Sequence, residues 1–160
     1  MNTKSTMMST ESELNRFFGP PKPGQFGVYD GVEFAVFKRG SPVSIGIASL
    51  VMSGGMVIST EWWKGPFLRV FLPTPFHVDM LVSPREVPLL AGEIFDRIFT
   101  TTGTNPTFAR HLIPAQLSDV MVDLRQNYHT QLHDDCLEFG PLLDTERAAD
   151  DLLDVIEMLN

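Results

Sequence analysis

Hydrophobic and polar residues alternate along much of the first half of the chain, which predicts β-strands because successive strand side chains point to opposite faces. The clearest pair of segments, residues 26–29 and 32–37, flanks Asp30-Gly31, which suits a two-residue type I′ turn. Turns containing Gly or Pro separate four further strand-like segments. These are residues 44–52, 56–62, 67–72 and 76–82. The pattern predicts an N-terminal antiparallel β-meander of about six strands.

The hydrophobic period changes within residues 93–125. Residues 93–101 still alternate and predict one more strand, whereas the apolar residues that follow have the spacing of a core-facing helix. Asn105-Pro106 predicts a helix start, because Asn caps a helix and Pro fits its first position. We therefore expect a short helix over residues 106–112 and a longer one over residues 114–128.

The C-terminal part predicts a hairpin followed by a helix. Residues 129–133 and 136–139 flank Asp134-Asp135, which is a plausible turn. In residues 144–159 the apolar side chains share one helical face and most acids point away from it. The predicted fold class is therefore α+β: a meander, then a strand, helices, a β-hairpin and a C-terminal helix.

The N-terminus predicts an arm. Residues 1–8 are polar and rich in Met, and we expect them to be disordered. Thr10-x-x-Glu13 has the form of a capping box and predicts a short helix over about residues 11–18. A Pro-rich linker then ends the arm at residue 24. Residues 25–160 have the length of a single α+β domain.

Three short motifs follow one another in the second half of the chain. They are Gly92-x-x-Phe95-Asp96-x-x-Phe99, Ala109-Arg110-x-Leu112-x-Pro114 and Asp123-Leu124-Arg125. Their order resembles a pattern found in uncharacterised bacterial domains, in which a meander precedes a strand–helix–hairpin–helix tail. The resemblance covers residues 25–160 and implies this order of elements and a bacterial origin. It implies no activity, because none is established for those domains.

The net charge of −8 arises at one end of the chain. Residues 1–133 contain 11 acidic and 11 basic side chains, whereas residues 134–160 contain nine acids and only Arg147 as a base. An acidic end disfavours binding to nucleic acid and to anionic lipid surfaces. It fits either a solvated helix face or a surface for a basic protein partner. The candidate interaction residues of the last helix are Asp150, Asp151, Asp154 and Glu157.

The sequence gives no sign of export or membrane insertion. The first 18 residues lack the apolar core of a signal peptide, and no apolar run approaches the ~20 residues of a membrane span. The single cysteine, Cys136, excludes an internal disulfide framework and is compatible with a reducing compartment. We therefore expect a cytoplasmic location.

Aromatic residues form a second candidate interaction surface. Trp62 and Trp63 are adjacent on a predicted strand, so they face opposite sides and one of them can be exposed. With Phe67 nearby, an exposed Trp would form an apolar patch of the kind that marks interfaces. The alternative is that other parts of the chain cover both rings.

Two groups of residues could carry chemistry. His129, His133, Asp135 and Cys136 are potential zinc ligands. On a strand, however, the two histidines would lie about 13 Å apart, too far to share one metal, so we favour a polar hairpin rim. His77 and Asp79 share a face of a predicted strand and could act as an acid–base pair, although alternating polar residues on a surface strand also explain them. We expect no cofactor.

These observations favour a non-enzymatic domain that binds a protein partner, either another protein or a second copy of itself. The surface would be the aromatic strand, the acidic last helix, or both. A metal-dependent or acid–base hydrolase is one alternative, and it requires the His and Asp groups to converge in one pocket. Small-ligand binding within a closed β-sheet is the other.

Overall fold

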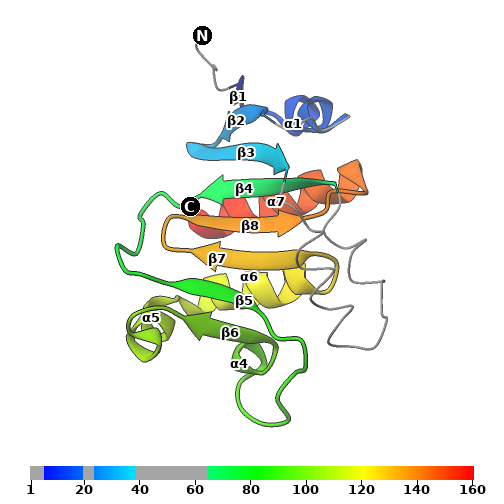
Figure 1. Ribbon diagram of the computed structural model, residues 1–160. Coiled ribbons are helices and arrows are strands. Elements are labelled where there is room, and N and C mark those ends of the chain that lie inside the picture. The colour runs from blue at the N-terminus through cyan, green and yellow to red at the C-terminus, as the bar shows by residue number, and fades with distance from the viewer. Residues whose placement is uncertain (1–5, 20–23, 39–64) are drawn as a thin grey trace.

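The computed structural model describes residues 6–19, 24–38 and 65–160, which form a mixed eight-stranded sheet packed against helices (Figure 1). The strands are β1 (Thr6–Met8), β2 (Phe26–Tyr29), β3 (Val32–Lys38), β4 (Pro66–Phe71), β5 (Leu81–Pro84), β6 (Phe99–Thr102), β7 (His129–His133) and β8 (Cys136–Gly140). The described helices are α1 (Glu11–Phe17), α4 (Ile94–Ile98), α5 (Pro106–Leu112), α6 (Ala115–Arg125) and α7 (Thr145–Leu159). The predicted α+β class is confirmed. The predicted strands over residues 44–52 and 56–62 lie outside the described residues.

Both predicted hairpins are present. β2 and β3 pair antiparallel around Asp30 and Gly31, whose φ angles of +50° and +78° are those a type I′ turn requires. β7 and β8 pair antiparallel around the predicted turn. Local turn chemistry and strand alternation are sufficient to explain both hairpins.

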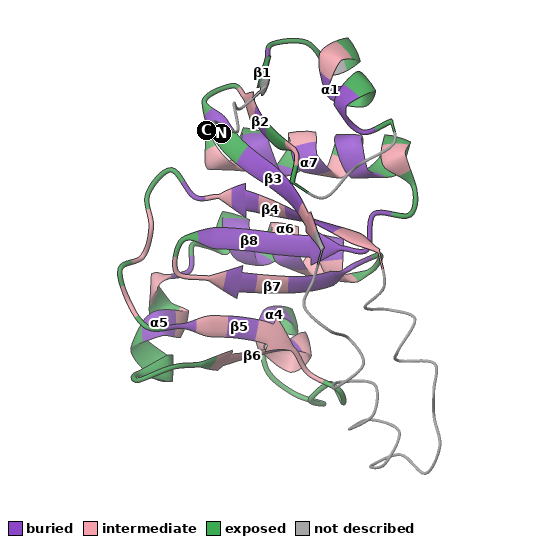
Figure 2. Cartoon of the chain, turned by 45° about the horizontal axis from the view of Figure 1, so that its top comes forward, coloured by how far each residue is buried: buried purple, intermediate pink, exposed green. Residues whose placement is uncertain are grey.

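The second hairpin occupies the middle of the sheet, whose order is β1-β2-β3-β4-β8-β7-β5-β6. β8 pairs with β4 and β7 pairs with β5, so β4 and β5 are not neighbours as a simple meander would have them. Within the described residues the meander therefore consists of β2, β3 and β4. Figure 2 shows that β8 is buried along its whole length, as a strand covered on both faces must be.

Two predicted strands differ from the structure. Residues 93–101 form the short helix α4 followed by β6. Phe95 and Phe99 are four residues apart, a sequence separation that a helical turn brings into contact as readily as strand alternation keeps them on one face. Their rings pack against each other with centroids 5.0 Å apart. In the predicted strand over residues 76–82, only the last two residues belong to β5. His77 has a φ of +58°, which interrupts an extended backbone.

α5, α6 and α7 begin where the sequence predicts, within a residue. Asn105 caps α5 by accepting a hydrogen bond from the backbone N–H of Phe108 at 3.2 Å. Pro114 is the residue before α6, and α6 ends at Arg125, earlier than the predicted position 128. α6 and α7 lie against the same face of the sheet (Figure 1). Their buried side chains meet those of the central strands, and the largest include Phe34, Phe99, Phe139, Met121, Leu132 and Leu152.

The N-terminal residues join the sheet and the core. Residues 6–8, which we expected to be disordered, form β1 and pair in parallel with β2. The predicted helix is present as α1, capped by Thr10, whose hydroxyl accepts the N–H of Glu13 at 3.2 Å. Phe18 after it is completely buried and stacks against Phe34. The division into an arm of residues 1–24 and a domain of residues 25–160 stays a prediction.

A matched pair of Leu→Ala variants tests the central position of the hairpin. Leu137 on β8 is completely buried, whereas Leu143 just after β8 is 83% exposed. We expect Leu137→Ala to lower the free energy of unfolding by about 2–5 kcal/mol through the lost contacts and the cavity left behind. Leu143→Ala should change it by less than about 0.5 kcal/mol. Chemical denaturation measures both, and equal effects would contradict this sheet order.

Candidate functional site

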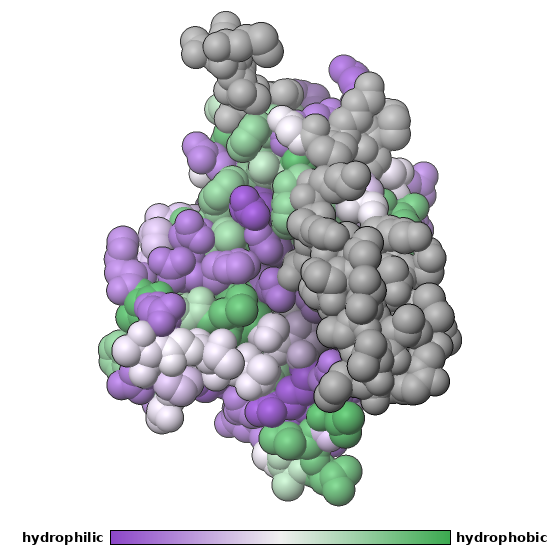
Figure 3. All heavy atoms as spheres, in the orientation of Figure 1, coloured by the Kyte–Doolittle hydropathy of each residue, from purple (hydrophilic) through white to green (hydrophobic). Residues whose placement is uncertain are grey.

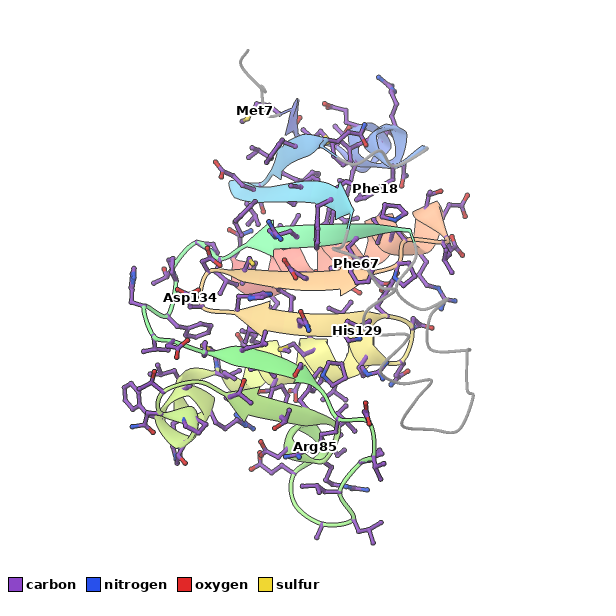
Figure 4. The ribbon with its side chains drawn as sticks, viewed as in Figure 1. Met7, Phe18, Phe67, Arg85, His129 and Asp134 are labelled. Carbon is purple, nitrogen blue, oxygen red and sulfur yellow. The ribbon has the colours of Figure 1, made fainter. Side chains whose placement is uncertain are left out.

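The face of the sheet opposite α6 and α7 carries a cluster of four polar or titratable side chains, Arg69, His133, Cys136 and Glu138. Strand register explains the cluster. Arg69 on β4 lies directly opposite Glu138 on β8, and Cys136 is two residues before Glu138 and so shares its face. His133 ends β7 beside the turn at Asp134 (Figure 4), just beyond the pair formed by Leu132 and Leu137.

Glu138 is the centre of this cluster, with a side chain only 6% exposed. The Nε and Nη2 atoms of Arg69 both lie 2.7 Å from its Oε2 atom. The Nε2 atom of His133 lies 3.1 Å from its other oxygen, Oε1. The guanidinium of Arg69 also stacks over the ring of Phe37, 4.3 Å from its centroid. Glu138 is therefore a buried carboxylate held on both oxygens.

The surroundings of Glu138 and Cys136 shift the pKa values of both side chains. Burial pushes the pKa of Glu138 up, but the hydrogen bonds from His133 and Arg69 and their charges outweigh burial and hold the pKa below its usual range. Burial, aided by the negative charges of Glu138 and Asp135, raises the pKa of the Cys136 thiol. A thiol held protonated in this way is a poor nucleophile, so the cluster does not resemble a cysteine-based active site.

The structure brings together two of the four residues that the sequence suggested as metal ligands. His133 and Cys136 face each other across the hairpin, and Glu138, which we did not predict, completes a group whose ligand atoms all lie within 4.8 Å of one another. His129 lies at the far end of β7, opposite Gly140, and Asp135 is exposed in the turn. The sequence did contain a signal for Glu138. It lies two residues after Cys136 on the predicted strand, so both side chains point to the same face of the sheet.

In the proposed acid–base pair of His77 and Asp79, the carboxylate of Asp79 is hydrogen-bonded to a neighbouring turn. The Oδ2 atom of Asp79 accepts hydrogen bonds from the N–H of Thr104 at 3.0 Å and from its hydroxyl at 2.7 Å. This carboxylate therefore holds the turn between β6 and α5. His77 is exposed in the irregular segment before β5.

The predicted aromatic surface lies mostly outside the described residues, because Trp62 and Trp63 are not among them. Phe67 is described and completely buried, so its ring offers no surface to a partner. It packs over Gly140, where an added Cβ would lie 2.9 Å from the Phe67 Cα. Its ring also meets that of His129, with centroids 6.4 Å apart (Figure 4).

The predicted acidic surface is present on α7. Asp150, Asp154 and Glu157 are exposed. Asp151 is partly buried and accepts a hydrogen bond from the hydroxyl of Tyr128 at 2.6 Å, which ties α7 to the short segment between α6 and β7. Burial is the main cause that raises the pKa of Asp151, and the charges of Asp154 and Asp150 raise it further against the opposing effects of Tyr128 and Arg147.

A groove that the sequence did not reveal lies between α4 and α6, with a volume of about 540 Å³. Its wall mixes apolar and acidic side chains, which include Ile94, Ile113, Val122, Glu93, Asp119 and Asp123. Arg110 also lines it, but its guanidinium binds Asp96 at 2.7 Å and Glu93 at 3.4 Å. Ser118 lines the groove from α6, and its buried hydroxyl has no hydrogen-bond partner in the described part of the chain.

No sequence signal marks this groove, because its residues come from segments that pack together only in the folded chain. Among the described helices, none is long and apolar enough to cross a membrane. Comparisons with protein-family models, with curated proteins and with solved structures found no match. The resemblance to uncharacterised bacterial domains therefore rests on the three sequence motifs.

Proposed function

We propose that this protein is a non-enzymatic interaction domain, and that the groove between α4 and α6 binds a basic, partly apolar segment of a partner protein. The observation that carries the proposal is the lining of the groove, in which the exposed apolar side chain of Ile94 is combined with Asp119 and Asp123, two carboxylates that pair with no cation among the described residues. Such a surface matches a segment that combines apolar anchors with Lys or Arg.

The apolar part of this surface is exposed. Ile94, at the start of α4, is 58% exposed and lines the groove. In the connection before α4, Val87 and Leu90 are 78% and 98% exposed, and Leu89 is 45% exposed. Figure 3 shows hydrophobic atoms gathered at the lower end of the view, where Figure 1 places this connection. Clustered exposed apolar side chains favour an interface, because covering them removes apolar surface from water.

The acidic part supplies the charge that selects the partner. Asp119 and Asp123 on α6 form no ion pair with any described residue. The exposed acids of α7 extend this negative surface beyond the groove, since α6 and α7 pack side by side and a small hollow between them is lined by Asp123, Asp151 and Asp154. A cationic segment would gain attraction to both helices.

The raised pKa of Asp151 supports this interpretation. Neighbouring acids on α7 contribute to the shift, so negative charges are close enough there to repel one another. A Lys- or Arg-containing segment would relieve that repulsion, and the same field would accelerate its encounter with the domain. The proposal includes a cytoplasmic setting, with which the single cysteine is compatible.

Synthetic peptides test the groove. We expect a fluorescently labelled peptide of alternating Leu and Lys to bind, and its Leu/Glu and Ser/Lys counterparts to bind at least about tenfold more weakly. Fluorescence anisotropy measures the dissociation constants. Ile94→Asp, and separately the double variant Asp119→Lys with Asp123→Lys, should each weaken Leu/Lys binding about tenfold or more. Raising salt should weaken it in the unmodified protein.

Two matched variants control for nonspecific effects. Leu143→Asp places the same charge on an exposed apolar site away from the groove, and Glu33→Lys reverses an exposed acid on β3. Both should leave Leu/Lys binding unchanged. Equal binding of the Leu/Glu peptide, or equal losses in control and groove variants, would contradict the proposal. So would a dimer, seen by light scattering, that Ile94→Asp dissociates while no peptide binds, since the occupant would then be a second copy.

The pKa of Asp151 predicts a pH-dependent effect of its replacement. Because its pKa is raised in the folded state, its ionised form disfavours folding, and this penalty grows as the pH rises from the unfolded-state pKa to the raised folded-state pKa. Asp151→Asn keeps an acceptor for the Tyr128 hydroxyl but removes the charge. We expect the variant to be more stable than the unmodified protein near pH 7 and the difference to vanish below about pH 3.8, as measured by denaturation across this range. Lower stability of the variant at neutral pH would contradict this.

A further inference from the structure

We propose that His133, Cys136 and Glu138 bind one zinc ion on the face of the sheet opposite α6 and α7. The three residues offer an imidazole nitrogen, a thiolate and a carboxylate oxygen, the ligand types that zinc selects. This site is separate from the groove between α4 and α6, and neither proposal depends on the other.

The separations between the ligand atoms fit a tetrahedral ion. Bond lengths of about 2.0 Å to nitrogen or oxygen and about 2.3 Å to sulfur place neighbouring ligands roughly 3.3–3.8 Å apart. The three ligand atoms already lie within 4.8 Å of one another. The His133 Nε2 and Glu138 Oε1 atoms, 3.1 Å apart, are already close to the separation of two ligands of one ion.

The zinc ion and Arg69 do not compete for the same oxygen of Glu138, because the two oxygens have different partners. The guanidinium binds Oε2 alone, through both Nε and Nη2. Oε1 faces His133, and a metal bond at Oε1 would replace that hydrogen bond. Arg69 would then orient the carboxylate from outside the metal's own ligands, a role that such partners commonly have at zinc sites.

The exchange is balanced in protons. The Cys136 thiol loses its proton to solvent on binding. The proton that the Nε2 atom of His133 donates to Glu138 without the metal moves to Nδ1 of the same ring, which leaves the Nε2 lone pair for the ion. One divalent cation enters and one proton leaves, so the net charge of the cluster rises by one. Three protein ligands leave the fourth position for a water molecule.

The site is reached from the edge of the hairpin. The His133 side chain is 36% exposed next to the turn at Asp134, whereas Cys136 and Glu138 are 5% exposed. An ion can therefore enter past the imidazole and be held by the two buried ligands. Bound there, it would link both strands of the central hairpin to each other beside their turn.

Metal titration of the full chain, first stripped with a chelator, tests the proposal. We expect zinc to bind at one equivalent in competition with a chromophoric chelator and to raise the melting temperature, because it binds the folded state. Cobalt(II), used as a spectroscopic substitute, should give a thiolate-to-cobalt charge-transfer band. Cys136→Ser should abolish this band, and His133→Ala should weaken zinc binding at least about tenfold. The matched control His111→Ala removes an exposed histidine of α5 and should change neither result.

Several outcomes would overturn the site. The unmodified protein could bind no zinc at one equivalent, or could bind cobalt without a charge-transfer band. Binding could also persist unchanged in Cys136→Ser and His133→Ala, or disappear in His111→Ala. If either ligand variant fails to fold by circular dichroism, the cobalt spectrum of the unmodified protein decides the question alone.

Discussion

The pairing of β8 with β4 is the contact on which the rest of the structure depends. It joins strands about 70 residues apart in sequence and so connects the N-terminal strands to the C-terminal hairpin in one sheet. One side of β8 contributes Leu137 and Phe139 to the core beneath the helices. The other side places Glu138 opposite Arg69. Closing so long a loop costs chain entropy, which burial on both faces of β8 offsets.

This arrangement gives the molecule two distinct chemical surfaces. The sheet face without α6 and α7 has a buried carboxylate that Arg69 and His133 hold in place, and burying such a charge is tolerable only because both oxygens are satisfied. The helical side has carboxylates exposed to solvent next to apolar side chains. The first surface is where we propose a zinc ion, and the second is where we propose a larger partner with distributed positive charge.

Local chemistry accounts for the elements that the sequence predicted well. The Asp30-Gly31 turn, the Thr10 and Asn105 caps and the apolar stripe of α7 each depend on residues a few positions apart. Where the expectation was wrong, contacts formed in the folded chain outweighed the local alternation. Residues 94–98 are helical although they alternate, and Arg110 binds Asp96 and stacks on Phe95 from α5. Phe76, expected in a strand, instead donates its N–H to the carbonyl of Asp134.

The sequence by itself determined the α+β class, both hairpins, most helix boundaries and the acidic character of α7, because spacing and turn chemistry act over one or two turns of chain. Only the tertiary structure decided that the second hairpin lies in the middle of the sheet, since strand order depends on contacts between distant segments. It also selected Glu138 as the partner of His133 and Cys136, and assembled the groove between α4 and α6. Both features exist only where separate elements pack together, and no spacing along the chain encodes that packing directly.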